Sequence, residues 1–352
     1  MLTSTINLLM SYFRKIFTTS LILLNLLILP ACKDDISYPD DPYGNFDALA
    51  EIIATRYCFL EEKGVDWDEV TAQYRAKITP DMSDLQLFGL CAEMLDQLRD
   101  GHVNLTSRFD TSYYRKWWSD YPQDFNLRTL QEYYLDFDYY STSGLNYKVL
   151  DGNIGYLYYP SCASGISETA LDYALAIMYD TEGLIIDIRN NGGGLLTNID
   201  VLIGRFIDRK IPGGSICHKT GPGKNDFSTP YPFSYSPAPD VRVKYLDKPI
   251  VLLTNRACYS AANAFAAVMK SLPQVTIIGA RTGGGSGLPF SSELPNGWSV
   301  RFSASPLYGP DGTITEFGVN PTPGFECHST PEDLAAGRDP ILDTAIQHLS
   351  NR

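Results

Sequence analysis

The sequence is poor in the residues on which several classes of function depend. Lysine and arginine together number 28 against 41 aspartates and glutamates, so the formal net charge is −13. Phosphate binding needs clustered basic residues, and no basic stripe occurs, which argues against nucleic acid as a partner. Histidine occurs four times, and the cysteines after residue 32 have neither paired nor metal-ligand spacing. The composition fits a globular protein of one large domain or two unequal ones.

Long hydrophobic runs are also scarce, and the run near the N-terminus is typical of a targeting segment. Arg14 and Lys15 precede the apolar stretch 17–29, which is too short and too interrupted by Thr and Ser for a membrane span. The stretch ends in Leu29-Pro30-Ala31-Cys32, which resembles the lipobox of bacterial lipoproteins. The resemblance implies a signal peptide over residues 1–31, with cleavage before Cys32 and lipidation of that cysteine. An uncleaved anchor helix is the alternative.

The residues around the lipobox bear on where the protein acts. Lys33-Asp34-Asp35 is similar to the surface-export signal of Bacteroidetes lipoproteins, and residues 32–44 form a tether between lipid and domain. Met10 is an alternative start, because residues 10–31 alone contain a charged, an apolar and a cleavage region. We therefore expect an outer-membrane lipoprotein of the cell envelope, exposed at the surface, whose contact with the membrane is through its lipid anchor only.

Hydrophobic periodicity predicts three regions after the tether. Residues 45–105 contain three amphipathic stretches, which predict a small N-terminal helical bundle. Residues 106–146 form an aromatic-rich connecting segment that either covers a cleft or packs as a short β-ribbon. In residues 147–352 strands and helices alternate, which predicts an α/β core with β-hairpins at 288–304. Within that core the Gly- and Pro-rich stretch 213–239 is expected to be a surface excursion.

The segment 249–287 carries the strongest chemical signal. An apolar strand, Ile250 to Leu253, leads through a polar turn to Ser260, which opens a helix of small residues. Helix amides carry partial positive charge, so a nucleophile at this turn has oxyanion donors beside it. The alternative is an N-cap serine in an ordinary α/β unit. Cys258 lies two residues earlier and is a competing nucleophile.

Other motifs favour the catalytic interpretation. In Glu182–Leu196 a buried strand is followed by Asp187, Arg189, two asparagines and three glycines, and Leu98–Leu105 places His102 after a helical stretch. Together with Glu316-Phe317-Gly318-Val319-Asn320-Pro321, these motifs resemble peptidase family S41, the C-terminal processing and tricorn-type serine peptidases. The resemblance covers residues 47–349 and implies a ClpP/crotonase-like catalytic core of β-β-α units. Too few residues separate the bundle from the core for a PDZ domain.

The resemblance also implies a nucleophile and an oxyanion hole. Ser260 takes the place of the family nucleophile, and this ranks Cys258 well below it. The backbone amides of Gly193 and Ala261 would bind the oxyanion. Glycine suits this position because a backbone amide approaches a substrate closely only where no side chain intervenes. The glycine is uncertain by one residue, so any of 192–194 is a candidate.

The base distinguishes two branches of the family. The C-terminal processing branch uses a lysine from a loop in which this chain has Gly285, and no lysine follows Lys270. The tricorn-type branch takes its base from the N-terminal bundle, where this chain has His102, and imidazole titrates near neutral pH. Glu316 aligns with a glutamate of the tricorn-type charge network and would orient His102, either directly or through a bridging hydroxyl.

These assignments predict a serine endopeptidase that acts outside the cytoplasm on a peptide or an unfolded protein. Its Ser-His acyl-enzyme mechanism requires no cofactor and no metal. The alternative is a catalytically inactive relative that binds a peptide or an apolar ligand on the aromatic-rich segment. A surface glycan-binding lipoprotein is a third possibility, which rests on the export signal and the same aromatic residues.

The lipobox leads to a test of membrane attachment. Replacement of Cys32 by serine removes the thiol needed for the thioether bond to lipid, so Cys32→Ser should move the protein out of the membrane fraction. Fractionation and metabolic labelling with a fatty acid would measure this. Unchanged fractionation would mean that residues 17–29 anchor the chain themselves.

Overall fold

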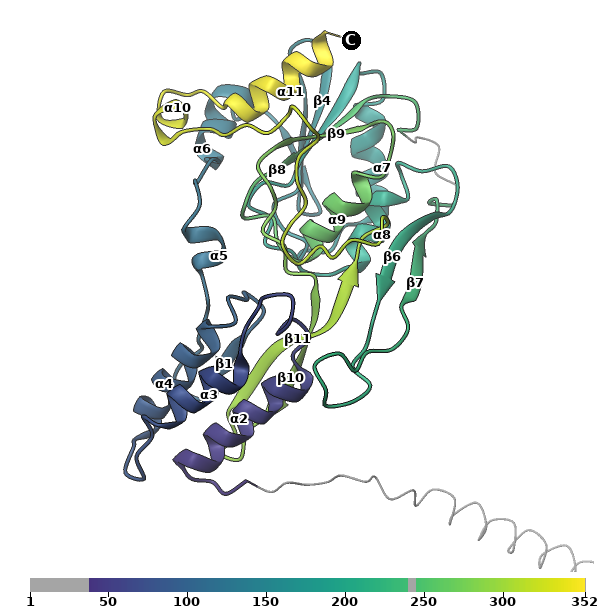
Figure 1. Cartoon of the computed structure of the whole chain (residues 1–352). Coiled ribbons are helices and arrows are strands. Elements are labelled where there is room, and N and C mark those ends of the chain that lie inside the picture. Colours follow the sequence, from purple (N-terminus) through teal and green to yellow (C-terminus); the bar gives the residue numbers. More distant parts are fainter. Residues whose placement is uncertain (1–37, 240–244, 352) are drawn as a thin grey trace, which may run out of the picture. The chain divides into compact units, whose positions relative to one another are not determined.

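A six-stranded sheet forms the centre of the protein (Figure 1). The computed structural model describes residues 38–239 and 245–351, so the predicted signal peptide and Cys32 lie outside the described residues. Contacts group residues 39–352 into one unit. The last four strands of the sheet pair in parallel, and the first two pair antiparallel. In spatial order the strands are β2 (Tyr140–Thr142), β3 (Leu145–Leu150), β4 (Ile154–Tyr158), β5 (Gly183–Asp187), β8 (Ile250–Thr254) and β9 (Val275–Gly279).

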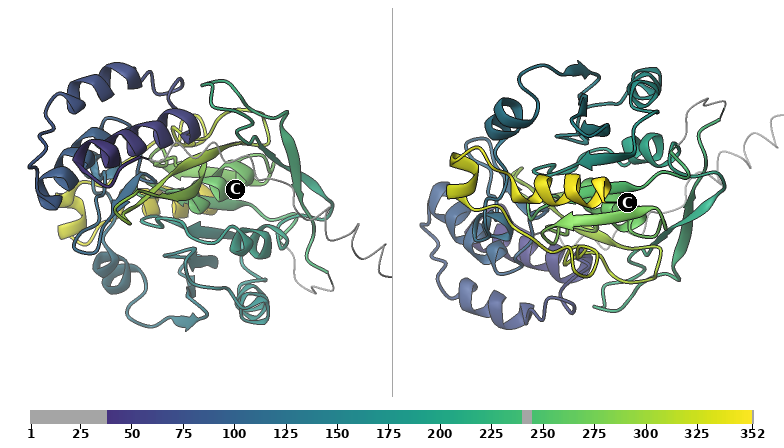
Figure 2. Two further views of the ribbon diagram at one scale, coloured as in Figure 1. Left: turned by 90° about the horizontal axis from the view of Figure 1, so that it is seen from below. Right: turned by 90° about the horizontal axis from the view of Figure 1, so that it is seen from above.

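Helices cover both faces of this sheet, which explains why its central strands are buried along their whole length. Leu184 and Ile186 of β5 pack on the face that carries α7 (Glu168–Ile177), α8 (Thr197–Ile203) and α9 (Ala261–Met269). Ile185 packs on the opposite face with α11 (Pro340–Ser350) and the π-helix η1 (Leu130–Tyr134). Figure 2 shows α11 lying across the central strands.

A second, antiparallel sheet brings the N-terminal part of the chain to the core. Strand β1 (Asn104–Thr106) pairs with β11 (Ser299–Tyr308), which also pairs with β10 (Gly287–Glu293) and with β6 (Ile211–Ile216). Strand β7 (Tyr231–Tyr235) pairs with β6. The stretch 213–239 is therefore not simply the surface excursion expected from its composition. The pairing of β6 with β7 depends on backbone hydrogen bonds rather than on hydrophobic alternation, so the Pro- and Gly-rich composition gave no strand signal.

The N-terminal helices begin at polar caps. The helices α2 (Pro42–Arg56), α3 (Trp67–Arg75) and α4 (Asp84–Asp96) start after Asp41, Asp66 and Ser83, whose side chains accept backbone N–H bonds. The aromatic-rich segment forms the short helices α5 (Lys116–Ser119) and α6 (Leu127–Thr129), and α10 (Pro331–Ala335) precedes α11. The predicted fold class, an α/β core preceded by a helical bundle, is confirmed. Among the described residues, no helix is long and apolar enough to cross a membrane.

A buried ion cluster joins the end of β5 to the C-terminal helix. Arg189 is fully buried, and its guanidinium donates to Asp187 Oδ2 at 2.7 Å and to Asp339 Oδ1 at 2.9 Å. Tyr156 donates its hydroxyl to Asp187 Oδ2 at 2.8 Å. Asp339 is also the N-cap of α11, where it accepts from the amide of Leu342. One carboxylate therefore neutralises a buried cation and begins a helix.

This cluster predicts a large loss of stability on removal of one partner. Asp339→Ala leaves Arg189 with an incompletely compensated buried charge, so the free energy of unfolding should fall by about 3–5 kcal/mol. Asp208→Ala is the control, because Asp208 is exposed and forms a surface ion pair with Arg209 at 3.6 Å; its effect should be within about 0.5 kcal/mol. Urea denaturation followed by circular dichroism measures both. Equal effects of the two substitutions would contradict this account.

Candidate active site

The turn between β8 and α9 holds Ser260 in a strained backbone conformation. Its φ is 54° and its ψ is −118°, a region that residues other than glycine rarely occupy. Two backbone hydrogen bonds fix the turn: the Ser260 amide donates to Gly284 O at 2.8 Å, and the Tyr259 amide donates to Asn191 O at 3.0 Å. The Ser260 side chain makes no capping hydrogen bond to α9. The half-buried hydroxyl of Ser260 is therefore not used to cap the helix.

Gly193 lies directly against this turn. A Cβ atom on Gly193 would lie 2.7 Å from Ser260 Cβ and 2.9 Å from Ala261 N, and the residue has a φ of +92°. No other residue type fits there. Ala261 is the first residue of α9, so its amide has no acceptor within the helix. The Gly193 amide, in contrast, donates to Asn191 Oδ1 at 3.0 Å. It would have to exchange this bond for an oxyanion.

His102 and Ser260 line one cavity of about 550 Å³, together with the glycines 192–194. His102 follows α4, is 5% exposed, and lies with its ring centroid 4.9 Å from that of Tyr259. Its Nδ1 is buried and has no hydrogen-bond partner among the described residues. Burial lowers the pKa of His102 to about 4, and the attraction of Asp100 only partly opposes this shift. The imidazole is thus neutral at neutral pH.

Asp100 accepts hydrogen bonds from His102 and from two hydroxyl groups near it. Its carboxylate accepts the His102 amide at 2.8 Å and the hydroxyls of Tyr57 and Ser303, both at 2.9 Å. Burial by itself would raise the pKa of Asp100. The charges of Lys63 and His102 and these hydrogen bonds hold that pKa below its usual range. An ionised carboxylate therefore fixes the loop that carries His102.

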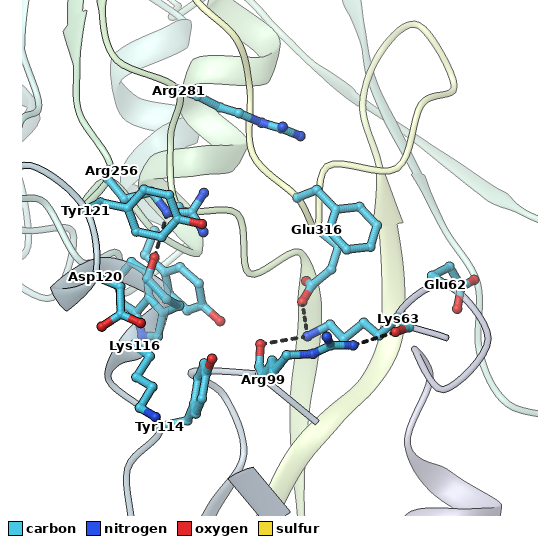
Figure 3. A pocket seen from close by; sticks show the side chains of 14 residues that line it. Glu62, Lys63, Arg99, Tyr114, Lys116, Asp120, Tyr121, Arg256, Arg281 and Glu316 are labelled. Atoms are coloured by element: carbon cyan, nitrogen blue, oxygen red, sulfur yellow. Dashed lines mark hydrogen bonds and ion pairs between the residues drawn. The ribbon is translucent and has the colours of Figure 1, made fainter. Parts of the chain in front are cut away.

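Glu316 shares a lysine with Asp100 and is not hydrogen-bonded to His102. Lys63 Nζ lies 2.7 Å from Glu316 Oε1 (Figure 3). It also lies 3.3 Å from Asp100 Oδ2, and Glu316 Oε2 accepts the Ser286 amide at 2.8 Å. Burial and the nearby Asp100 charge raise the pKa of Glu316 to about 7, although Lys63 opposes this. Any effect of Glu316 on His102 must therefore pass through Lys63, Asp100 or the chain at Ser286.

The glycine-rich loop after β9 is shaped by its contacts with the nucleophile turn. A Cβ on Gly285 would lie 2.3 Å from the ring of Tyr259, and one on Gly284 would lie 1.8 Å from Glu316 O. Both glycines have positive φ. A lysine at position 285 would collide with Tyr259, which gives a physical reason why this chain carries no base in that loop.

Cys258, the competing nucleophile, is inert, and two of the other histidines lie elsewhere. Cys258 is fully buried, donates to Ile188 O at 2.9 Å, and has its pKa raised by burial, so it is a poor nucleophile. His218 contacts Ser305, and His328 contacts Asp124; neither lines the cavity of Ser260. Among the described residues, no group of three or more His, Cys, Asp or Glu is placed to hold a metal ion.

The residues that sequence reasoning missed have weak sequence signals. Asp100 stands two residues before His102, and its place in the same motif could have drawn attention to it. Lys63 lies in a polar loop between two helices, and nothing in the pattern links it to residues 100 or 316. Only the folded chain brings these groups together.

Comparisons with known proteins find related sequences for two parts of the chain. Residues 153–323 match the sequence model of peptidase family S41, and residues 38–96 match that of the tricorn protease C1 domain. A candidate tricorn-like protease C-terminal subunit of Sulfurisphaera tokodaii is 29% identical over 56% of this chain and 21% of its own length. The carboxy-terminal processing protease CtpB of Bacillus subtilis is 25% identical over 54% of this chain and 37% of its own. The chain thus spans well under half the length of these relatives.

A solved structure covers more of the chain. A candidate peptidase from Parabacteroides merdae is 46% identical, with a TM-score of 0.83, over 88% of this chain and 97% of its own. The similarity to this structure extends over nearly the whole of both chains, whereas the family's sequence model matches residues 153–323. The chain therefore belongs to peptidase family S41, a family of serine-type peptidases.

Proposed function

We propose that the protein is a serine endopeptidase that hydrolyses peptide bonds through an acyl-enzyme formed on Ser260. The observation that carries this proposal is the single cavity in which a strained serine, a neutral histidine and the glycines 192–194 meet. The substrate is a peptide or an unfolded protein. The chain acts at the cell envelope, attached through lipid on Cys32, as its N-terminal sequence suggests.

The chemistry follows from the arrangement of these groups. Ser260 Oγ attacks the scissile carbonyl carbon as His102 takes the hydroxyl proton, which forms a C–O bond and a tetrahedral oxyanion. The amide of Ala261, and that of Gly193 once released by Asn191, donate to the oxyanion. His102 then passes the proton to the leaving amine as the C–N bond breaks. Water hydrolyses the resulting ester by the same steps.

Asp100 and Glu316 support the base without touching the substrate. Protonation of a buried imidazole is costly, and the nearby charge of Asp100 lowers that cost during the reaction. Lys63 keeps Asp100 ionised, and Glu316 in turn holds Lys63 at 2.7 Å. Glu316 is thus a positioning residue that acts through Lys63, rather than a direct partner of His102. An inactive ligand-binding relative remains the alternative function.

The nucleophile assignment leads to a direct test. Ser260→Ala should lower kcat for an unfolded protein substrate by about 10⁴- to 10⁶-fold and abolish labelling by a serine-directed phosphonate. Cys258→Ala is the matched control and should keep both. Labelling is read by intact-protein mass spectrometry. A wild-type protein that cleaves nothing and takes up no phosphonate would favour the inactive alternative.

The lowered pKa of His102 predicts how kcat/KM depends on pH. The neutral imidazole is the active form, and a pKa near 4 keeps it neutral down to acidic pH, so kcat/KM should fall only as the pH drops through about 4. At neutral pH His102→Gln should cost about 10²- to 10⁴-fold in kcat, and Glu316→Gln should cost less. Circular dichroism at each pH separates titration from unfolding. A limb near pH 7 that disappears in Glu316→Gln would instead assign the essential ionisation to Glu316.

A further inference from the structure

The charged side chains that line the catalytic cavity are of one sign, although the whole chain is acidic and the buried Asp100 carboxylate lies behind His102. The cavity that Ser260 and His102 line contains two charged side chains, Arg115 and Arg301, and no Asp or Glu. The formal net charge of the chain is −13. A cleft of one sign within a protein of the other sign attracts ligands of the opposite charge.

Arg301 is held at the cavity wall without a carboxylate partner. It lies on β11 opposite Asn104 of β1, and its Nη1 donates weakly to His102 O at 3.4 Å and to Asn104 Oδ1 at 3.3 Å. No carboxylate lies within 4.0 Å of it among the described residues. Burial lowers the pKa of Arg301, but a guanidinium remains charged in proteins. This half-buried cation therefore has unused donors.

Arg115 approaches the cavity from the segment before α5. Its side chain is exposed and lies over the ring of Tyr113, with the guanidinium carbon 5.5 Å from the ring centroid. It has no ion pair among the described residues. Because it is exposed, Arg115 can adjust to a ligand, whereas Arg301 is fixed by the sheet.

The adjoining cavity extends the positive potential (Figure 3). Its volume is about 670 Å³, and it shares the side chains of Tyr114, Trp117 and Tyr259 with the catalytic cavity. Four of its cations have no carboxylate within 4.0 Å among the described residues: Arg99, Lys116, Arg256 and Arg281. Its acids are Glu62, Asp120 and Glu316, and the last of these is paired with Lys63. Cations are thus in excess on both sides of the Trp117–Tyr259 stack.

We propose that Arg301, assisted by Arg115, binds a carboxylate of the substrate, so that the enzyme selects acidic peptides. A carboxylate accepts two parallel N–H bonds from a guanidinium, and such charge-assisted bonds are the strong ones. The carboxylate comes from an Asp or Glu side chain near the scissile bond or from the C-terminus of the peptide. The inference rests on the proposed peptidase activity and names its substrate class.

The bound carboxylate also affects the base. Burial first and the Arg301 and Lys63 charges next lower the pKa of His102, while Asp100 raises it. A substrate carboxylate on Arg301 offsets one of these positive charges and makes the imidazole a stronger base. An acidic substrate should therefore have a higher kcat as well as a lower KM.

Peptides that differ in one group test the proposal. A fluorogenic peptide cleaved by the enzyme is made with Glu, Gln or Lys at each position around the scissile bond, and with a C-terminal acid or amide. At one position kcat/KM should be on the order of tenfold higher for Glu than for Gln, and lowest for Lys. A preference for the free C-terminal acid over the amide, with no effect of Glu, would identify the chain terminus as the source of the carboxylate.

Variants then assign the selectivity to the two arginines. Arg301→Gln should bring the acid-to-amide ratio close to one, Arg301→Lys should keep part of it, and Arg115→Gln should reduce it without affecting the fold. Arg209→Gln is the matched control, because Arg209 is 82% exposed and outside both cavities. A merely structural role of Arg301 would lower the rates for all peptides equally and leave the ratio unchanged.

The outcomes separate this proposal from the activity on which it rests. Hydrolysis of Glu, Gln and Lys peptides at equal rates, with acid and amide termini also equal, overturns the carboxylate site and leaves the peptidase assignment intact. A ratio that Arg301→Gln and Arg115→Gln both leave unchanged overturns it as well. A wild-type protein that takes up no phosphonate on Ser260 and cleaves no peptide overturns the proposed function itself.

Discussion

One lysine between two buried carboxylates connects the two parts of the candidate active site. Lys63 comes from the loop after α2, Asp100 from the loop after α4, and Glu316 from the loop after β11. Two buried carboxylates so close together cannot both ionise readily without a cation between them. Burial and the Asp100 charge accordingly raise the pKa of Glu316, and Lys63 opposes that rise. His102 depends on it, because the Asp100 carboxylate that holds the His102 amide is kept ionised by the same lysine.

Tyr259 links the buried charges to the nucleophile. Its hydroxyl donates to Asp100 at 3.2 Å, its ring stacks on Trp117 at 4.0 Å, and its backbone amide is bound by Asn191. The next residue is Ser260, so the position of the nucleophile is tied to the buried charges and to the wall of the cavity at once. Strain at Ser260 is tolerated because the surrounding contacts over-determine the turn.

The local and the overall electrostatics of the protein differ in sign. The net charge of the whole chain is negative, but substrate capture depends on the potential inside the cleft. There Arg301 lines the catalytic cavity and Arg256 lines the adjoining one, and neither guanidinium has a carboxylate partner within the described part of the chain. The Arg301 charge also adds to burial in lowering the pKa of His102. Selection of the substrate and readiness of the base are therefore coupled through one residue.

The sequence by itself determined the alternation of strands and helices, the three N-terminal helices, and two strand-to-helix turns, one with a serine and one rich in glycine. These features depend on local periodicity and on residues close together in the chain. The roles of Ser260, His102 and Glu316 stay predictions, although the fold does bring Ser260 and His102 to one cavity. Only the tertiary structure decided that Glu316 contacts Lys63 instead of His102, and that Arg301 enters the cleft. Contacts between residues about 200 to 250 positions apart follow from strand pairing and packing, which leave no periodic pattern in the sequence.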